Sequence, residues 1–115
     1  MNKKKQQRIN QALRLLDKSF NIKFNVVKIN THNSIYHELA KCKKVYELID
    51  AGNTIITEAI FKNGSRADIL CLNKFQVFEI LHTEKEKEAL IKTIKYPDEL
   101  DIFYLSSMEV LGENQ

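Results

Sequence analysis

The spacing of hydrophobic residues predicts two amphipathic helices in the first half of the chain. In each run, apolar residues recur every three or four positions, as they do on one face of an α-helix. The first run spans residues 4–20, and its stripe consists of Ile9, Leu13, Leu16 and Phe20. The second run spans residues 35–49, and its stripe consists of Ile35, Leu39, Cys42, Tyr46 and Ile49. We expect both stripes to face a hydrophobic core.

The rest of the chain is rich in β-forming residues and predicts a sheet. The expected strands are residues 22–29, 54–61, 66–72, 75–81 and 100–105. Asn63-Gly64 predicts a tight hairpin turn, and Asn73-Lys74 predicts the next one. Thr83 and Glu86 have the spacing of a capping box, so a helix is expected over residues 84–95, before Pro97. From Ser34 onward the predicted order is α-β-β-β-α-β, an α/β fold with a mixed central sheet flanked by helices.

Length and composition favour one globular domain. The chain has 115 residues, of which 43% are apolar and 29% charged, and it has only three Gly and one Pro. We divide it into a basic N-terminal helix and strand (residues 1–33), a core (34–106) and a tail (107–115). No apolar run approaches the about 20 residues that span a bilayer, so we expect no membrane partner and a cytoplasmic location. Cys42 and Cys71 are expected to be free thiols.

Basic residues are concentrated at the N-terminus. The net charge is only +3, yet residues 1–20 contain six basic side chains against Asp17 alone. Such a segment is suited to binding phosphates, because lysine and arginine release counterions from a nucleic-acid backbone. A solvated helix face explains the same pattern equally well.

Two acids are predicted to meet in the middle of the sheet. With a two-residue turn at Asn73-Lys74, Asp68 lies directly opposite Glu79. Two like charges in a cross-strand pair repel, and apolar surroundings make them costlier. Mg²⁺ would compensate them, since it prefers carboxylate oxygens. The alternative is a structural pair satisfied by arginine, lysine or backbone donors, and Arg66 points to the same side as Asp68, where it could pair with that acid or contact a phosphate.

Other polar residues rank by their expected positions. Glu38 lies on the flank of the apolar stripe of the second helix and can reach the sheet, whereas Glu47 lies on the opposite side of that helix. With a two-residue turn at Asn63-Gly64, Ala59 is opposite Asp68, which puts Glu58 on the other face unless a bulge intervenes. Glu58 and His82 are therefore second-rank candidates. We expect the three histidines to be ordinary surface or cap residues; they are His32, His37 and His82.

Three strings in this order resemble the PD-(D/E)XK nuclease superfamily. They are Tyr36-His37-Glu38-Leu39-Ala40, Arg66-Ala67-Asp68-Ile69-Leu70 and Phe78-Glu79-Ile80-Leu81, and the resemblance covers residues 34–106. The superfamily includes restriction endonucleases and archaeal Holliday junction resolvases, so the resemblance implies a restriction endonuclease-like fold. It also implies that Glu38, Asp68 and Glu79 are catalytic and bind Mg²⁺ or Mn²⁺.

The resemblance implies hydrolysis of phosphodiester bonds in DNA, in which the metal activates water and stabilises the developing charge. The nucleic-acid-binding residues would be Lys3, Lys4, Lys5, Arg8 and Arg66. The superfamily's usual lysine is replaced by Leu81, and Lys41, one helical turn after Glu38, is the candidate substitute. A catalytically weakened or inactive DNA-binding module on the same fold, or a structural interaction protein, are the alternatives. Resolvase-like members act as dimers, so a homodimer is expected.

Overall fold

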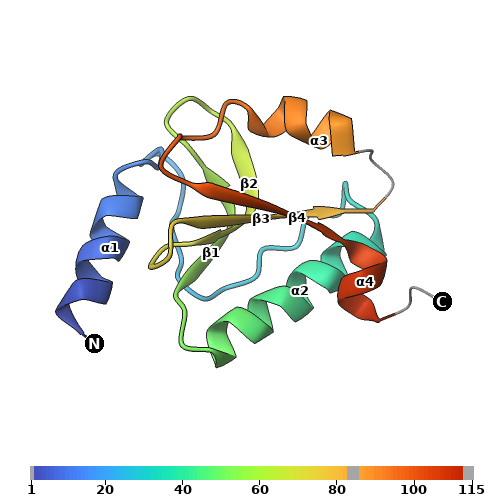
Figure 1. Cartoon of the computed structure of the whole chain (residues 1–115), viewed down its shortest axis with the longest axis horizontal. Coiled ribbons are helices and arrows are strands. Elements are labelled where there is room, and N and C mark those ends of the chain that lie inside the picture. Colours follow the sequence, from blue (N-terminus) through green and yellow to red (C-terminus); the bar gives the residue numbers. More distant parts are fainter. Residues whose placement is uncertain (1, 83–85, 113–115) are drawn as a thin grey trace.

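The computed structural model describes residues 2–82 and 86–112 and shows a mixed α/β fold (Figure 1). The elements in chain order are α1 (Lys3–Leu13), α2 (Ile35–Asp50), β1 (Ile55–Ile60), β2 (Arg66–Cys71), β3 (Gln76–Leu81), α3 (Glu86–Thr93), β4 (Asp101–Ser106) and α4 (Ser107–Leu111). The predicted order α-β-β-β-α-β is therefore confirmed from α2 to β4. The short helix α4 lies where only a tail was expected.

The four strands form one mixed sheet in the order β1-β2-β3-β4. The first three strands are antiparallel neighbours, and β4 runs parallel to β3 because α3 connects them as a crossover. Figure 1 shows α2 and α4 on one side of the sheet and α3 on the other. The chain returns beside β3 after α3, so β2 and β3 lie in the interior of the sheet.

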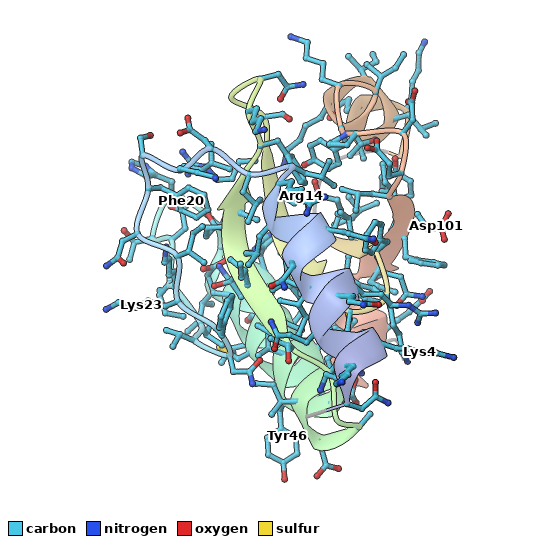
Figure 2. All side chains as sticks on the ribbon, turned by 90° about the vertical axis from the view of Figure 1, so that its left-hand side faces the viewer. Lys4, Arg14, Phe20, Lys23, Tyr46 and Asp101 are labelled. Carbon is cyan, nitrogen blue, oxygen red and sulfur yellow. The ribbon has the colours of Figure 1, made fainter. Side chains whose placement is uncertain are left out.

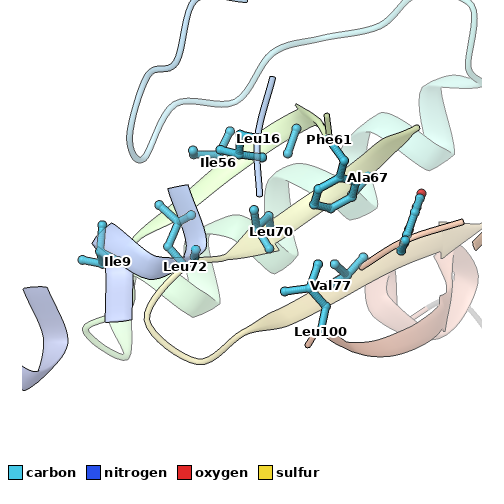
Figure 3. Close-up of a cluster of buried hydrophobic side chains, with 12 residues drawn as sticks. Ile9, Leu16, Ile56, Phe61, Ala67, Leu70, Leu72, Val77 and Leu100 are labelled. Carbon is cyan, nitrogen blue, oxygen red and sulfur yellow. The ribbon is translucent and has the colours of Figure 1, made fainter. Parts of the chain in front are cut away.

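Each face of the sheet has its own hydrophobic core. On one face, Ile9 and Ala12 of α1 pack with side chains that include Leu70, Val77 and Tyr96 (Figure 3). On the other face, Val45 and Leu48 of α2 pack with side chains of β1, β2 and β3. Burial of apolar area on both faces explains why these strands are apolar at nearly every position.

The first hairpin differs from its prediction by one residue. Phe61 N donates to Ser65 O over 2.9 Å, so the loop contains three residues, 62–64, and not two. Gly64 ends it with φ of +88°, the left-handed conformation that closes three-residue hairpin loops. Ala59 consequently pairs with Ala67, and the prediction that it lies opposite Asp68 was wrong.

Glu58 therefore occupies the position across from Asp68. Its φ of +52° is left-handed, which is rare for a residue with a side chain. The ordinary alternation of side chains breaks here, because two successive side chains point to the same face. Thr57 Oγ1 donates to Val26 O, and Glu58 accepts from Lys41 Nζ of α2. A local backbone distortion thus brings Glu58 to the α2 face, from which the predicted register had excluded it.

The first helix is shorter than its hydrophobic pattern. It ends at Leu13, and Leu16 instead forms an isolated antiparallel bridge with Phe61 of the first hairpin. Lys62 N donates to Leu15 O and Asp17 N donates to Ile60 O, so the chain leaves α1 by attaching to the end of β1. Leu16 is fully buried all the same, which is why it fits the apolar stripe.

Residues 22–29 do not form the expected strand. The segment runs beside β1, but most of its bonds to that strand involve a side chain. Asn25 N donates to Ile55 O, and Ile55 N donates to Asn25 Oδ1. Further along, Lys28 N donates to Thr57 Oγ1. Since these side-chain bonds replace a regular ladder, the segment lies along the edge of the sheet as irregular chain.

The second helix turns a different face to the sheet from the one predicted. The supposed core residues Ile35, Leu39 and Tyr46 are exposed, and Tyr46 projects from the body of the molecule in Figure 2. The inward face instead includes His37, Glu38, Lys41, Val45 and Leu48. Three of these five side chains are polar, so hydrogen bonds hold the N-terminal half of α2 to the sheet.

Two further expectations have mixed outcomes. Of the helix expected over residues 84–95, the structure shows α3 at Glu86–Thr93, which ends two residues early. The first two residues of that range, and Thr83 of the capping box, lie outside the described residues. Cys42 and Cys71 are free cysteines, as predicted. Among the residues described, no helix has the length and apolar character needed to cross a bilayer.

Candidate functional site

Asp68 and Glu79 meet where the pairing of β2 and β3 stops. Regular pairing ends at Ile69 and Phe78, and the predicted register places Asp68 and Glu79 at the next position. There each carboxylate reaches the other strand's backbone: Asp68 N donates to Glu79 Oε2 over 2.9 Å, and Ile80 N donates to Asp68 Oδ2 over 2.8 Å. Two side-chain bonds thus replace the ladder at this point.

His37 joins Asp68 to Glu38. The ring Nε2 lies 3.2 Å from Asp68 Oδ2, and Nδ1 lies 2.6 Å from Glu38 Oε2. His37 and Glu38 lie in the first turn of α2, where Ser34 caps the helix by accepting a bond from His37 N. The start of α2 therefore positions both side chains over β2. His37 was expected to be a cap or surface residue, so its position between the two acids is a correction.

Four donors hold the carboxylate of Glu38. Its Oε1 accepts bonds from Asn30 N (2.6 Å) and Lys41 Nζ (2.7 Å), and its Oε2 accepts bonds from Asn33 Nδ2 (3.2 Å) and His37. The irregular segment before α2 supplies two of these donors. Residues 30–33 thus fix Glu38 in place, a role that the sequence analysis did not predict for this segment.

Lys41 is fully buried and links two acids. Its ammonium lies 2.7 Å from Glu38 Oε1, 3.4 Å from Glu58 Oε2 and 2.7 Å from Lys28 O, which matches its three N–H donors. The resemblance made Lys41 the candidate substitute for the lysine that Leu81 replaces. In the structure the side chain of Lys41 positions Glu38 and Glu58, and it does not line the pocket described below.

Glu79 shares a proton network with Tyr96. The Tyr96 hydroxyl lies 2.5 Å from Arg66 O and also contacts Glu79 Oε1. A phenol has one proton and cannot donate to both oxygens at once. A proton on Glu79 that is donated to the Tyr96 oxygen satisfies every atom, while Tyr96 donates to Arg66 O. The geometry therefore favours a neutral Glu79.

The ionisation of these groups follows from their surroundings. Burial, together with the charge of Asp68, raises the pKa of Glu79 to about 8. Burial also opposes the charge on Asp68, but the hydrogen bond and charge of His37 outweigh it and lower the pKa of Asp68. In the same way burial opposes a charge on His37, yet Asp68 and Glu38 raise its pKa. The two carboxylates thus differ: Asp68 is an ion and Glu79 an acid near neutral pH.

A pocket of about 270 Å³ lies beside Asp68. Its lining residues come from the segment before α2 and from α2, β1, β2 and α3: Asn30, Asn33, His37, Glu58, Arg66, Asp68 and Lys92. Within the pocket, Asn30 Nδ2 donates to Glu58 Oε1 over 3.3 Å, and Arg66 Nη1 lies 3.7 Å from the same oxygen. The pocket therefore combines carboxylates with two basic side chains, the combination that phosphoryl chemistry uses.

The donors in this region fit a divalent cation by their chemistry. Asp68 and Glu58 line the pocket, Glu38 is joined to both through His37 and Lys41, and all three offer the carboxylate oxygens that Mg²⁺ prefers. Within residues 2–82 and 86–112, no three His, Cys, Asp or Glu side chains are arranged around one point as metal ligands. Of the expected ligand set of Glu38, Asp68 and Glu79, Asp68 alone lines the pocket, so the structure does not bring the three acids together around it.

The basic residues of α1 lie far from this pocket. Lys5 Nζ donates to Gly52 O, just after the C-terminus of α2, whereas Glu38 lies in its first turn. At 1.5 Å per residue, the part of α2 from Glu38 to Asp50 alone spans roughly 18 Å. Lys3, Lys4, Lys5 and Arg8 therefore do not join the acids, and of the predicted nucleic-acid-binding residues Arg66 alone lines the pocket.

His82 also lies outside the pocket. Its Nδ1 is 2.7 Å from Ser107 Oγ, and its ring stacks on Tyr36 with the centroids 5.3 Å apart. These contacts join β3, α2 and α4, and they give His82 a structural position. Its second rank as a site residue agrees with this placement.

Sequence reasoning missed four residues of the site. Lys92 comes from α3 and Tyr96 from the turn after it, and Asn30 and Asn33 come from the segment before α2. Lys41 carried a usable signal, because it shares a helix face with Glu38 at i+3 and with His37 at i+4. The positions of Lys92 and Tyr96 depend on how α3 packs on the sheet, which their spacing alone does not indicate.

Comparisons of the chain with protein-family models, with curated proteins and with solved structures find no match.

Proposed function

We propose that this protein is a metal-dependent nuclease of the PD-(D/E)XK type that hydrolyses phosphodiester bonds in DNA. One observation carries the proposal: Asp68 lines a pocket at the point where β2 and β3 separate, and His37 joins it to Glu38 at the start of α2. These are two of the three element positions that the resemblance implies for the acids. The order α-β-β-β-α-β, with β4 parallel to β3, is the order that the resemblance implies, and it supports a restriction endonuclease-like fold.

Each side chain of the site has a role in this proposal. Asp68 and Glu58, which line the pocket, would hold Mg²⁺ or Mn²⁺, and the bound metal would polarise the scissile phosphate and activate water. Glu38 would position them through His37 and Lys41. His37 orients Glu38 and Asp68 through its two ring nitrogens. Lys41 keeps Glu38 and Glu58 together, and it stabilises two neighbouring negative charges that would otherwise repel.

Glu79 acts in this scheme as a positioning residue. Its Oε2 accepts the backbone N–H of Asp68, which fixes the strand segment that carries the Asp68 carboxylate. A neutral Glu79 is suited to this role, because one oxygen accepts from Asp68 and the protonated oxygen donates to Tyr96. The role differs from the metal ligation that the resemblance implies for Glu79.

The second candidate is a DNA-binding module without catalysis. Leu81 at the position of the family's lysine favours it, and so does the complete burial of Lys41, whose three donors are already used. This module would bind DNA with the salt sensitivity of phosphate contacts and would cleave nothing.

Cleavage of supercoiled plasmid and of a branched DNA junction separates the two candidates. The purified protein is incubated with each substrate in Mg²⁺, in Mn²⁺ and in EDTA. The nuclease proposal predicts nicking only with metal, lost in Glu38→Gln and kept in Glu47→Gln, an exposed acid on the same helix. Absence of cleavage in both metals with DNA binding intact would contradict it and favour the binding module.

A further inference from the structure

Two basic side chains from different elements reach the Asp68 pocket. Arg66 begins β2, and Lys92 lies in the last turn of α3. Both line the pocket of about 270 Å³ that Asp68 and Glu58 also line. The Arg66 side chain is 56% exposed and the Lys92 side chain 49% exposed. The charged ends are therefore accessible to a ligand from solvent.

Each of the two cations lies near an acid of the site. Arg66 Nη1 lies 3.7 Å from Glu58 Oε1, and Lys92 Nζ lies 3.8 Å from Glu79 Oε1. Both distances exceed that of a good N–H···O hydrogen bond, about 2.9 Å. Glu58 thus attracts the Arg66 guanidinium toward the pocket, and the charge that attracts the Lys92 ammonium is that of Asp68, because Glu79 is neutral.

The pocket places two basic side chains, Arg66 and Lys92, beside the carboxylate of Asp68. We propose that Arg66 and Lys92 bind one phosphate group of a nucleic-acid strand next to Asp68. The planar guanidinium can donate two parallel N–H bonds to phosphate oxygens, and the ammonium adds a point charge. This inference rests on the proposed function and deepens it, because Lys92 then supplies from α3 the positive charge that Leu81 lacks on β3.

A second basic pocket serves as an internal comparison. It has a volume of about 370 Å³ and is lined by Arg8, Gln11, Asn73, Lys74 and Phe75. Its basic residues lie on α1 and in the turn between β2 and β3, away from the acids of the site. If any exposed pair of basic residues bound phosphate, this pocket would bind it as well as the Asp68 pocket does.

Phosphate binding is measured directly by NMR in the absence of metal. The ¹⁵N-labelled chain is titrated with inorganic phosphate in EDTA, and the Arg66 Nε–Hε resonance and the backbone amides of residues 66–68 and 91–93 are followed. We expect saturable shifts there. Arg66→Met and Lys92→Met should each weaken the binding about tenfold, as loss of a charged hydrogen bond does. Lys92→Arg should keep most of it, and Lys87→Met, an exposed change on the same helix, should have no effect.

A second titration identifies the source of the phosphate. A short DNA oligonucleotide should shift the same resonances and displace inorganic phosphate from them, and Lys92→Met should reduce the salt slope of oligonucleotide binding by about one. Shifts confined to Arg8 and Lys74, shifts scattered over the surface, or unchanged binding by Lys92→Met would overturn the inference. Phosphate binding at Arg66 and Lys92 in a protein that never cleaves DNA would overturn the nuclease proposal alone.

Discussion

Asp68 and Glu79 each accept a hydrogen bond from the other's strand, Asp68 N donating to Glu79 and Ile80 N donating to Asp68. Two adjacent carboxylates in a sheet would ordinarily repel. Here they differ in protonation, because His37 stabilises the charge of Asp68 while burial and Asp68 itself keep a proton on Glu79. The exchange thus satisfies two backbone donors and leaves Asp68 as the charged member of the pair.

The proton on Glu79 predicts a pH dependence of stability. Its pKa is about 8 in the folded chain against an ordinary value of 4.5, so between these values the folded state holds a proton that the unfolded state has released. The free energy of unfolding therefore falls as pH rises through this window, by up to about 1.4 kcal/mol per pH unit from this group. Below pH 4.5 the full contribution is present.

Glu79→Gln tests this dependence, because its amide donates to Tyr96 and its carbonyl accepts from Asp68 without titrating. Urea unfolding of both proteins at pH 5 and pH 8 should show the variant gaining stability relative to the wild type by a few kcal/mol at the higher pH. Parallel pH profiles would show that Glu79 is already ionised in the folded chain between pH 5 and pH 8 and would refute the proton assignment.

Tyr96→Phe should destabilise the protein by about 1–3 kcal/mol. The hydroxyl is the donor to Arg66 O, and its removal leaves that carbonyl and Glu79 without this partner in a buried region. Tyr46→Phe is the matched control, since Tyr46 is 71% exposed and its ring remains. Chemical denaturation measures both. Equal stability of Tyr96→Phe and Tyr46→Phe would mean that the Tyr96 hydroxyl contributes nothing.

The left-handed backbone at Glu58 predicts an unusual order of substitutions. In an ordinary strand, alanine is more stable than glycine by about 0.5–1 kcal/mol. At a φ of +52° the order should reverse, with Glu58→Gly more stable than Glu58→Ala by about 1 kcal/mol, because glycine adopts this conformation without strain. Both variants lose the carboxylate equally, so the difference in their unfolding free energies isolates the backbone. A more stable alanine variant would contradict the left-handed conformation.

The sequence predicted the order of the elements and the meeting of Asp68 with Glu79. The second hairpin has the register expected from Asn73-Lys74, with Ile69 opposite Phe78. The first hairpin does not, because Gly64 takes the third loop position, and the motif Asn63-Gly64 is compatible with both loop lengths. That one-residue difference changed the face assigned to Glu58.

The face of α2 could not be predicted from hydrophobicity, because the site overrides it. Amphipathic patterning assumes that buried positions are apolar. His37 and Lys41 are buried by hydrogen bonds to acids, while Leu39 and Tyr46 of the apolar stripe are exposed. The expected homodimer and the DNA partner stay predictions.

Metal-dependent cleavage by Asp68→Asn tests the central claim most directly. The variant keeps an oxygen that can accept from Ile80 N, so the fold should survive, but it lacks the charge that faces the pocket. Single-turnover cleavage of a labelled DNA junction in Mg²⁺ or Mn²⁺ is compared among the wild type, Asp68→Asn and Asp50→Asn, an exposed acid on α2. We predict that Asp68→Asn is slower by at least about 100-fold while Asp50→Asn matches the wild type. Cleavage by a folded Asp68→Asn at the wild-type rate would contradict the account.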